Sequence, residues 1–427
     1  MIIRDWKNMR ASIYYFCKLI FITRKYDVVF VSSVFFNRGE GGQNLLFKPM
    51  IEFCESNGLN YTIFEDTDLK GAYNKFKRNN KAVPFDFISL VQIMLKKIYN
   101  FKYKKPITKE EIYLRESKVS ECLRKLFFKK FHSKIYITLI WNNVTLWRTI
   151  DSSACIVDYQ HGIISDGDEA HIKDGYPPLI KSINGIVTLV YGNTFKDILI
   201  DNDKSRFYSE RNVINTGIYK NNIKSMNKIK KNNKKILFTL QITPDFEEKT
   251  INALYIEIVE ELMNVNAEFL RKNNYEIIFR HHPRYNTINC QDIILGYDFV
   301  SFDIQTPMVE LLNTVALHIT FHSTSVFEAA MVGVPTIFID MHKNFSPNEI
   351  FLKQYKYPCR NLVIRHYDQF ESILFALEEQ QVYSNYCNDV YKWSQELYHD
   401  FDSSIFGNFL LNELKKSNLN KEIINHE

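Results

Sequence analysis

The sequence predicts an α/β fold of two parallel-sheet domains that face each other across a cleft. A buried strand at 27–33, a glycine-rich loop, a helix that ends at Gly58 and a second strand at 61–66 form a strand-helix-strand unit typical of parallel sheets. The same rhythm restarts at 236–241, after a polar, basic connector at 221–235 without apolar periodicity. Because ligands bind at the carboxyl ends of parallel strands, two such domains in tandem predict a cleft between them.

The remaining elements follow in order along the chain. The first domain covers 1–220, with a helical, basic insertion at about 70–134. Its further strands are expected at 134–143, 155–162, 185–192 and 212–217. The second domain covers 235–400, with helices at 246–272 and 308–315 and further strands at 275–283, 316–321 and 334–340. The last segment, 401–427, is expected to form a helix or tail that packs back on the first domain.

The composition is that of a soluble globular protein, with 45% hydrophobic and 24% charged residues. The seven cysteines are scattered and form no CxxC pair, which excludes a zinc site or disulfide framework of that kind and favours the reducing cytoplasm. The apolar run at 11–22 is too short to span a bilayer and lacks a signal-peptide cleavage site. We therefore expect a packed or interfacial helix there.

Charge is unevenly distributed along the chain. The net charge is +5, yet residues 96–134 alone hold 13 Lys or Arg against 4 Glu. A basic face of this kind suits phosphates, nucleic acid or anionic lipid, whereas a solvated helical insertion is the structural alternative. We expect contact with anionic lipid at the inner face of the cytoplasmic membrane, and no nucleic-acid partner.

The stretch 279–285, FRHHPRY, follows a buried strand of the second domain. Side chains alternate along a strand, so only one of the two adjacent histidines should face the cleft. Pro283 ends the strand, and Arg280 and Arg284 beside His282 can stabilise the negative charge of a leaving group. The structural alternative is a basic strand end with a core histidine.

The stretch 320–333, TFHSTSVFEAAMVG, predicts a strand end followed by a helix. Ser325 and Glu328 have the spacing of a capping box, and Gly333 is expected to end the helix in the left-handed conformation. Together with Ser323 and Thr324, Ser325 places hydroxyl groups at a helix start, where backbone N–H groups favour a diphosphate. Glu328 can bind ribose hydroxyls, and a bare helix cap is the alternative.

In the first domain, Gln160-His161-Gly162 stands at a strand end, where glycine allows a sharp turn beside an imidazole. His161 can take a proton from a hydroxyl group, and Asp166 or Asp168 can orient it or act as the base instead. A histidine in a tight turn is the alternative.

The glycine-rich loop at 35–44, which contains Gly41 and Gly42, also follows a strand. It lacks the spacing of a dinucleotide or P-loop fingerprint. It could still contact phosphate, and a plain flexible turn is the alternative.

These motifs resemble those of bacterial GT-B glycosyltransferases that build capsule or lipopolysaccharide. RHHP and TFHSTSVFEAAMVGVPTIFID are similar to the His-Pro and Ser-Ser/Thr motifs of sialyltransferase and capsular transferase families and of CDP-glycerol polymerases. QHG resembles a capsule-transferase motif. The resemblance is good over 235–340. It implies the GT-B fold of two Rossmann-like domains and donor-phosphate contacts by His282, Ser323 and Thr324. It also implies an acceptor side that includes Gln160 and the glycine-rich loop with Gly41 and Gly42.

The expected activity is transfer of a sugar from a CMP-, CDP- or UDP-linked donor to a growing polysaccharide or lipid-linked glycan. Alternatives are a CDP-alditol phosphotransferase of teichoic-acid type, a nucleotide-sugar 2-epimerase, or a binding module. Asp-x-Asp triplets occur at 66–68, 166–168 and 201–203, and such triplets bind metal in GT-A enzymes. In this context we expect no metal site and no cofactor besides the nucleotide-sugar substrate.

Overall fold

The computed structural model describes residues 6–37, 39–66, 77–102, 108–140, 143–167, 169–220, 233–240, 249–281, 296–342 and 346–424. The chain forms two compact units. The first comprises Met1–Asn221 and His399–Glu427, and the second comprises Asn222–Tyr398.

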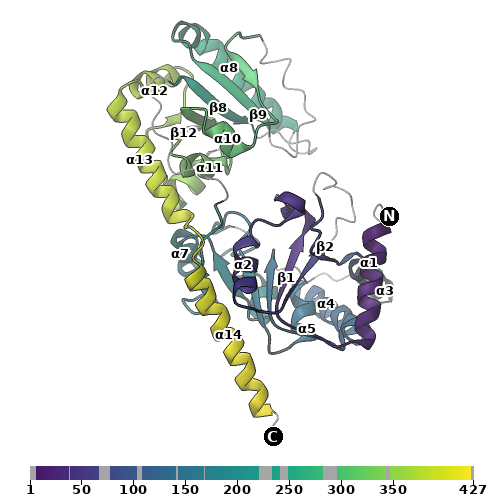
Figure 1. The fold of residues 1–427 in the computed structure, drawn as a ribbon. Coiled ribbons are helices and arrows are strands. Elements are labelled where there is room, and N and C mark those ends of the chain that lie inside the picture. Colours follow the sequence, from purple (N-terminus) through teal and green to yellow (C-terminus); the bar gives the residue numbers. More distant parts are fainter. Residues whose placement is uncertain are drawn as a thin grey trace. The chain divides into compact units, whose positions relative to one another are not determined.

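The first unit contains a seven-stranded parallel sheet in the order β3-β2-β1-β4-β5-β6-β7 (Figure 1). Its strands are β1 (Arg24–Ser33), β2 (Tyr61–Asp66), β3 (Val83–Pro84), β4 (Phe131–Leu139), β5 (Cys155–Tyr159), β6 (Val187–Val190) and β7 (Val213–Asn215). Its helices are α1 (Trp6–Phe21), α2 (Lys48–Ser56), α3 (Asp86–Lys102), α4 (Lys109–Leu123), α5 (Val144–Ile150), α6 (Leu179–Ile183), α7 (Asn193–Asn202) and α14 (Ser403–Ile424). Shorter turns are η1 (Val34–Phe36), η2 (Glu40–Gly42) and the π-helical η3 (Arg124–Phe128).

Both faces of this sheet are covered, as β1 illustrates. Val29 and Val31 enter one core together with residues of α1, α3, α4 and α5. Phe30 points the other way and packs on Phe47, with ring centroids 5.2 Å apart. A strand buried on both faces needs apolar residues at every position, which is why β1 appears in the sequence as an unbroken apolar run.

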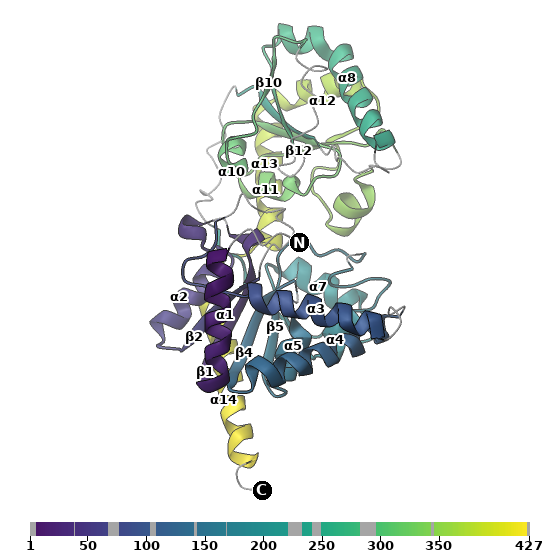
Figure 2. The ribbon, with the colours of Figure 1, turned by 90° about the vertical axis from the view of Figure 1, so that its right-hand side faces the viewer.

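The second unit contains a six-stranded parallel sheet in the order β10-β9-β8-β11-β12-β13 (Figure 2). Its strands are β8 (Lys235–Leu240), β9 (Glu276–His281), β10 (Val300–Phe302), β11 (Leu317–Thr320), β12 (Thr336–Ile339) and β13 (Val363–Ile364). Its helices are α8 (Lys249–Lys272), α10 (Met308–Leu312), α11 (Ser325–Met331), α12 (Gln369–Leu377), α13 (Gln380–Leu397) and the π-helical η6 (Asn348–Gln354). The strand order reverses between β1 and β4 in the first unit and between β8 and β11 in the second. Such switch points are where ligands bind in open α/β sheets.

The end of the chain returns to the first unit. Asp400 forms a parallel bridge with Ile218, and α14 contacts α2 and β4. Gly217 has a φ of +74°, and a Cβ atom there would lie 2.2 Å from the Asp400 carbonyl oxygen. Only glycine allows this close approach.

Helix α1 includes most of the apolar run at 11–22. Met9, Phe16 and Leu19 are buried, so the helix packs on its unit, as one of the two sequence alternatives expected. Among the helices in the described ranges, none is long and apolar enough to cross a membrane.

Candidate functional site

In the second unit, a basic side chain lies at the carboxyl edge of the sheet. Arg280 on β9 is in register with Thr239 on β8, and the Thr320 hydroxyl on β11 donates to the Thr239 carbonyl at 3.4 Å. Arg280, Thr239 and Thr320 thus form one row across three adjacent strands. The row spans the switch point between β8 and β11.

The Arg280 side chain is only 7% exposed, and backbone carbonyls hold it. Its Nη1 donates to the carbonyl oxygens of Thr306 at 2.7 Å and Asp303 at 3.3 Å. The nearest carboxylate oxygen of Asp303 is 3.9 Å away, and that group already accepts bonds from Gln305 and Thr306. The Arg280 Nε has no hydrogen-bond partner within the described residues. Burial lowers the pKa of Arg280, while Asp303 and Glu328 act in the opposite direction.

The hydroxyl loop at 322–325 differs in one respect from the capping box predicted for it. Helix α11 begins at Ser325 itself, and the Ser323 hydroxyl accepts from the Ser325 N–H at 3.2 Å. The capping box was wrong because Ser325 turns inward and its hydroxyl is used in the core. Glu328 is exposed, and α11 has only seven residues. Few peptide dipoles are therefore aligned there, so anion binding at this edge must rely mainly on side chains.

A buried imidazole explains why Ser325 turns inward. His318 on β11 is fully buried, and its Nε2 lies 3.0 Å from the Thr239 hydroxyl and 3.1 Å from that of Ser325. Its Nδ1 lies 2.9 Å from the Thr336 hydroxyl. Burial lowers the pKa of His318 to about 3, so the ring is neutral at physiological pH. This hydroxyl–imidazole node joins β8, β11, β12 and α11.

The end of α11 follows the sequence prediction. Gly333 has a φ of +75°. Its N–H donates to Ala330 and the N–H of Val334 donates to Ala329, both at 2.9 Å. These two bonds form a Schellman motif, which confirms the predicted left-handed helix end.

A histidine–tyrosine contact at this edge was also not predicted. His322 lies two residues after the end of β11, and its Nδ1 lies 3.0 Å from the hydroxyl of Tyr255 on α8. Burial lowers the pKa of His322. The histidine of HSTS was a signal in the sequence, but its partner lies on a helix, 67 residues away along the chain.

The histidine pair of FRHHPRY is described only in part. His281 is buried and stacks on Phe302 at 5.6 Å, so it belongs to the core, and burial lowers its pKa. His282, Pro283 and Arg284 lie outside the described residues, as does Asp168 in the first unit. Their predicted roles stay predictions.

In the first unit, the QHG turn is held from inside. Gln160 is fully buried; its Nε2 donates to the Gly162 carbonyl at 2.7 Å and its Oε1 accepts from the Tyr191 N–H at 2.8 Å. This side chain fixes the turn that presents His161. The His161 ring is half-buried, 5.8 Å from Phe36 of the glycine-rich loop. The two predicted acceptor-side motifs are therefore neighbours, and Asp166 is exposed nearby in sequence.

The first unit also contains a buried ion pair. Lys181 and Asp158 are both almost fully buried, with 2.6 Å between Nζ and Oδ2. The same Asp158 oxygen is 4.0 Å from His171, whose ring is 6.1 Å from that of His161. No motif predicted this cluster, because the lysine lies on α6, more than twenty residues from the strand.

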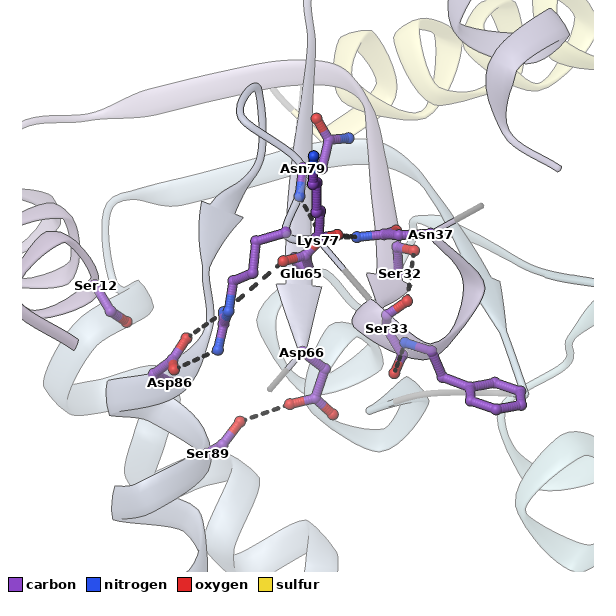
Figure 3. Close-up of polar contacts among 12 residues, drawn as sticks. Ser12, Ser32, Ser33, Asn37, Glu65, Asp66, Lys77, Asn79, Asp86 and Ser89 are labelled. Carbon is purple, nitrogen blue, oxygen red and sulfur yellow. Dashed lines mark hydrogen bonds and ion pairs between the residues drawn. The ribbon is translucent and has the colours of Figure 1, made fainter. Parts of the chain in front are cut away.

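A second buried carboxylate, that of Glu65, bonds to the glycine-rich loop (Figure 3). Glu65, at the end of β2, accepts from Asn37 Nδ2 at 2.6 Å and from the Asn79 N–H at 3.0 Å. Arg78 binds Asp86 through two bonds of 2.7 and 2.8 Å and lies 3.8 Å from Glu65. Burial raises the pKa of Glu65.

The predicted loop glycines have different surroundings. Gly42 is buried, with a φ of +78°, and a Cβ atom there would lie 2.3 Å from the Arg78 carbonyl oxygen. Gly41 is exposed and also has a positive φ of +64°. Glycine is thus needed at position 42 for a structural reason that is independent of any ligand.

A polar cavity of about 340 Å³ lies at the carboxyl ends of β2 and β4. Its lining includes Asp66, Gln92, Lys96, Asn143 and Thr145. It opens beside the switch point of the first sheet and is large enough for a hydroxyl-rich group.

No protein-family model and no curated protein matches the chain. Solved structures do match the chain. The UDP-GlcNAc 2-epimerase from Neisseria meningitidis bound to UDP-GlcNAc aligns with a TM-score of 0.51 and 14% identity, covering 91% of this chain and 100% of that one. The glycotransferase of kitacinnamycin aligns with a TM-score of 0.50 and 9% identity, covering 92% and 100%. At such low identity these likenesses establish architecture alone: the chain has the GT-B fold, as its sequence predicted.

Proposed function

We propose that the protein is a cytoplasmic, metal-independent glycosyltransferase that moves a sugar from a nucleotide-activated donor to a surface polysaccharide or lipid-linked glycan. The observation that carries the proposal is Arg280. It is a buried cation on β9, one strand from the switch point of the second sheet. Carbonyls accept from its Nη1, the Asp303 carboxylate lies 3.9 Å away, and its Nε is unpartnered in the described part of the chain. The Asp303 carboxylate beside it already accepts bonds from Gln305 and Thr306, so the open N–H of this buried guanidinium can be satisfied by a bound phosphate.

On the donor side, Arg280 and His282 would stabilise the departing phosphate, with the Ser323 and Thr324 hydroxyls as further donors. Glu328 would bind the ribose. Pro283 and Arg284 would shape and charge the same strand end, and Ser325 would hold the loop through the His318 node. Preorganised donors of this kind stabilise charge that develops as the bond breaks.

On the acceptor side, His161 would accept the hydroxyl proton as the oxygen attacks the anomeric carbon, with Asp166 or Asp168 as the alternative base. The bond from that carbon to the donor phosphate breaks, and the phosphate leaves with its electron pair. Gln160 would set the position of His161, and the exposed Gly41 and the cavity near Asp66 would receive the acceptor, with Gly42 keeping the loop in place.

A nucleotide-sugar 2-epimerase is the second candidate, because the epimerase and transferase structures match this chain equally well. It would consume the donor without an acceptor. A CDP-alditol phosphotransferase would release CMP, whereas a sugar transferase that uses a UDP or CDP donor releases the nucleoside diphosphate.

The first experiment measures thermal stabilisation by CMP, CDP, UDP and GDP. Ligand at a hundred times its Kd should stabilise the protein by about 2.7 kcal/mol. The double variant Ser323→Ala/Thr324→Ala should lose most of the shift, because both residues lie on the loop and neither is buried. Ser384→Ala on α13 removes a hydroxyl elsewhere in the same unit and should keep it.

No shift with any of the four nucleotides would refute the donor site. If one nucleotide binds, incubation with matching nucleotide sugars and analysis of the products separates the candidates. A 2-epimeric sugar formed without acceptor means an epimerase. Release of nucleotide that depends on added glycan means a transferase.

A further inference from the structure

Helix α1 has apolar side chains on both of its faces. Met9, Phe16 and Leu19 pack inward, yet Trp6, Ile13 and Ile20 are exposed on the outer side. Tyr14 is 68% exposed and Phe21 is 76% exposed. Large apolar side chains gathered on an exposed surface normally mark a site of interaction.

A second exposed stripe lies on α3. Met94, Lys97, Ile98 and Phe101 recur at helical spacing and are all exposed, Phe101 by 97%. Helices α1 and α3 are in contact. Figures 1 and 2 both show them next to each other on one side of the first unit. We call their exposed outer side the α1–α3 face.

The α1–α3 face is cationic as well as apolar. Helix α1 contains no Asp or Glu, and its three basic residues, Lys7, Arg10 and Lys18, are all exposed. Exposed Lys97 and Lys102 add to this charge on α3. The neighbouring α4 is nearly balanced, with four Glu against three Lys or Arg.

We infer that the α1–α3 face lies on an anionic lipid bilayer, with its aromatic and aliphatic side chains at the boundary between headgroups and acyl chains. Lysine is depleted in the cores of protein–protein interfaces, whereas anionic headgroups neutralise many lysines at once. Aromatic rings mixed with basic residues are typical of helices that lie in the membrane plane. The contact centres on α1, whereas the charge of the sequence alone pointed to 96–134. This inference needs no nucleotide chemistry, so it stands or falls separately from the proposed function.

The test is co-sedimentation of the full chain with vesicles of phosphatidylcholine alone and of phosphatidylcholine with 30% phosphatidylglycerol. We expect binding to the anionic vesicles only. Lys7→Gln/Arg10→Gln/Lys18→Gln should weaken it on the order of a hundredfold, because each basic residue near such a surface contributes several-fold. Tyr14→Ser/Phe21→Ser/Phe101→Ser should weaken it more than tenfold.

Phe375→Ser is the matched control, because Phe375 on α12 of the second unit is also 68% exposed. It should bind like the wild type. Acyl chains brominated near the headgroup should quench Trp6 fluorescence, and Trp6→Phe should remove that quenching. Wild-type binding by both triple variants would overturn the inference. So would a dimer that the aromatic triple variant dissociates, because the face would then be a contact between two copies.

Discussion

The carboxyl edges of the two sheets handle charge in opposite ways. In the first unit, buried carboxylates have cations at hydrogen-bond distance: Asp158 has Lys181 at 2.6 Å, and Asp86 has two bonds from Arg78. In the second unit, the buried imidazole of His318 is neutral, and the buried cation Arg280 bonds to carbonyls, with its nearest carboxylate oxygen at 3.9 Å. The first edge thus forms close ion pairs, whereas Arg280 in the second keeps its Nε open within the described residues.

This difference indicates that the two sheet edges have different roles. Matched charges rigidify loops but create little field beyond themselves, which suits an edge that must only present His161. A buried guanidinium whose Nε is open can bind a further anion. The comparison therefore favours the second unit as the phosphate-binding half of the proposed transferase, and the following variants break or sharpen it.

The largest effect should come from removing one partner of the buried ion pair in the first unit. Lys181→Met leaves Asp158 buried without its cation and should cost about 3–5 kcal/mol of unfolding free energy. Urea unfolding followed by the fluorine resonance of 5-fluorotryptophan at Trp147, in the first core, measures this. The double variant Asp158→Leu/Lys181→Met should recover much of the loss. A single variant with wild-type stability would contradict the matched-charge account.

Next in size is the close approach at Gly42. Gly42→Ala adds a left-handed residue and a Cβ atom 2.3 Å from the Arg78 carbonyl oxygen, and should destabilise the unit by about 3 kcal/mol. Gly58→Ala shares the positive φ, at +64°, but meets no atom within 4 Å. It should cost only about 1 kcal/mol. Equal losses in chemical denaturation would mean that the contact with Arg78 relaxes freely.

Because the buried His318 is neutral, we expect the second unit to be less stable at acid pH. His318 has a folded-state pKa of about 3 against 6.5 for an unperturbed histidine, so the unfolded chain takes up the proton first as the pH falls. Its stabilisation is complete above pH 6.5 and lost progressively toward pH 3, by about 2 kcal/mol at pH 5. The fluorine resonance of 5-fluorotryptophan at Trp393 reports unfolding of this unit. The variant His318→Gln should show a weaker dependence of stability on pH between 6.5 and 4. An unchanged slope would mean that other groups cause the acid sensitivity.

The smallest predicted effect concerns Arg280 in the second unit. Arg280→Lys keeps a cation but loses the planar fork, so we expect the affinity for the bound nucleotide to fall about tenfold, or 1.4 kcal/mol. Titration calorimetry measures it directly. Arg365→Lys is the control, since Arg365 follows β13 at the far end of the same sheet and is half exposed beside Asp340. A similar loss in both variants would point to general electrostatics instead of a site at Arg280.

Features set by local pattern could be read from the sequence. The strand at 61–66 and the helix end at Gly333 were predicted correctly, because apolar runs and a left-handed glycine depend on neighbouring residues. The capping box at Ser325 failed for the opposite reason. Its hydroxyl had a better partner in His318, on a different element, and no local rule includes that competition.

The sequence by itself determined the two parallel α/β domains, because strand and helix periods are properties of short windows. It also supplied the charges and the motif residues. Only the tertiary structure decided which charges are matched, since Asp158 meets a lysine from another helix and Arg280 meets carbonyls 23 and 26 residues away. The same holds for α1, whose two apolar faces are alike in sequence. Packing alone determined which face is buried and which remains exposed.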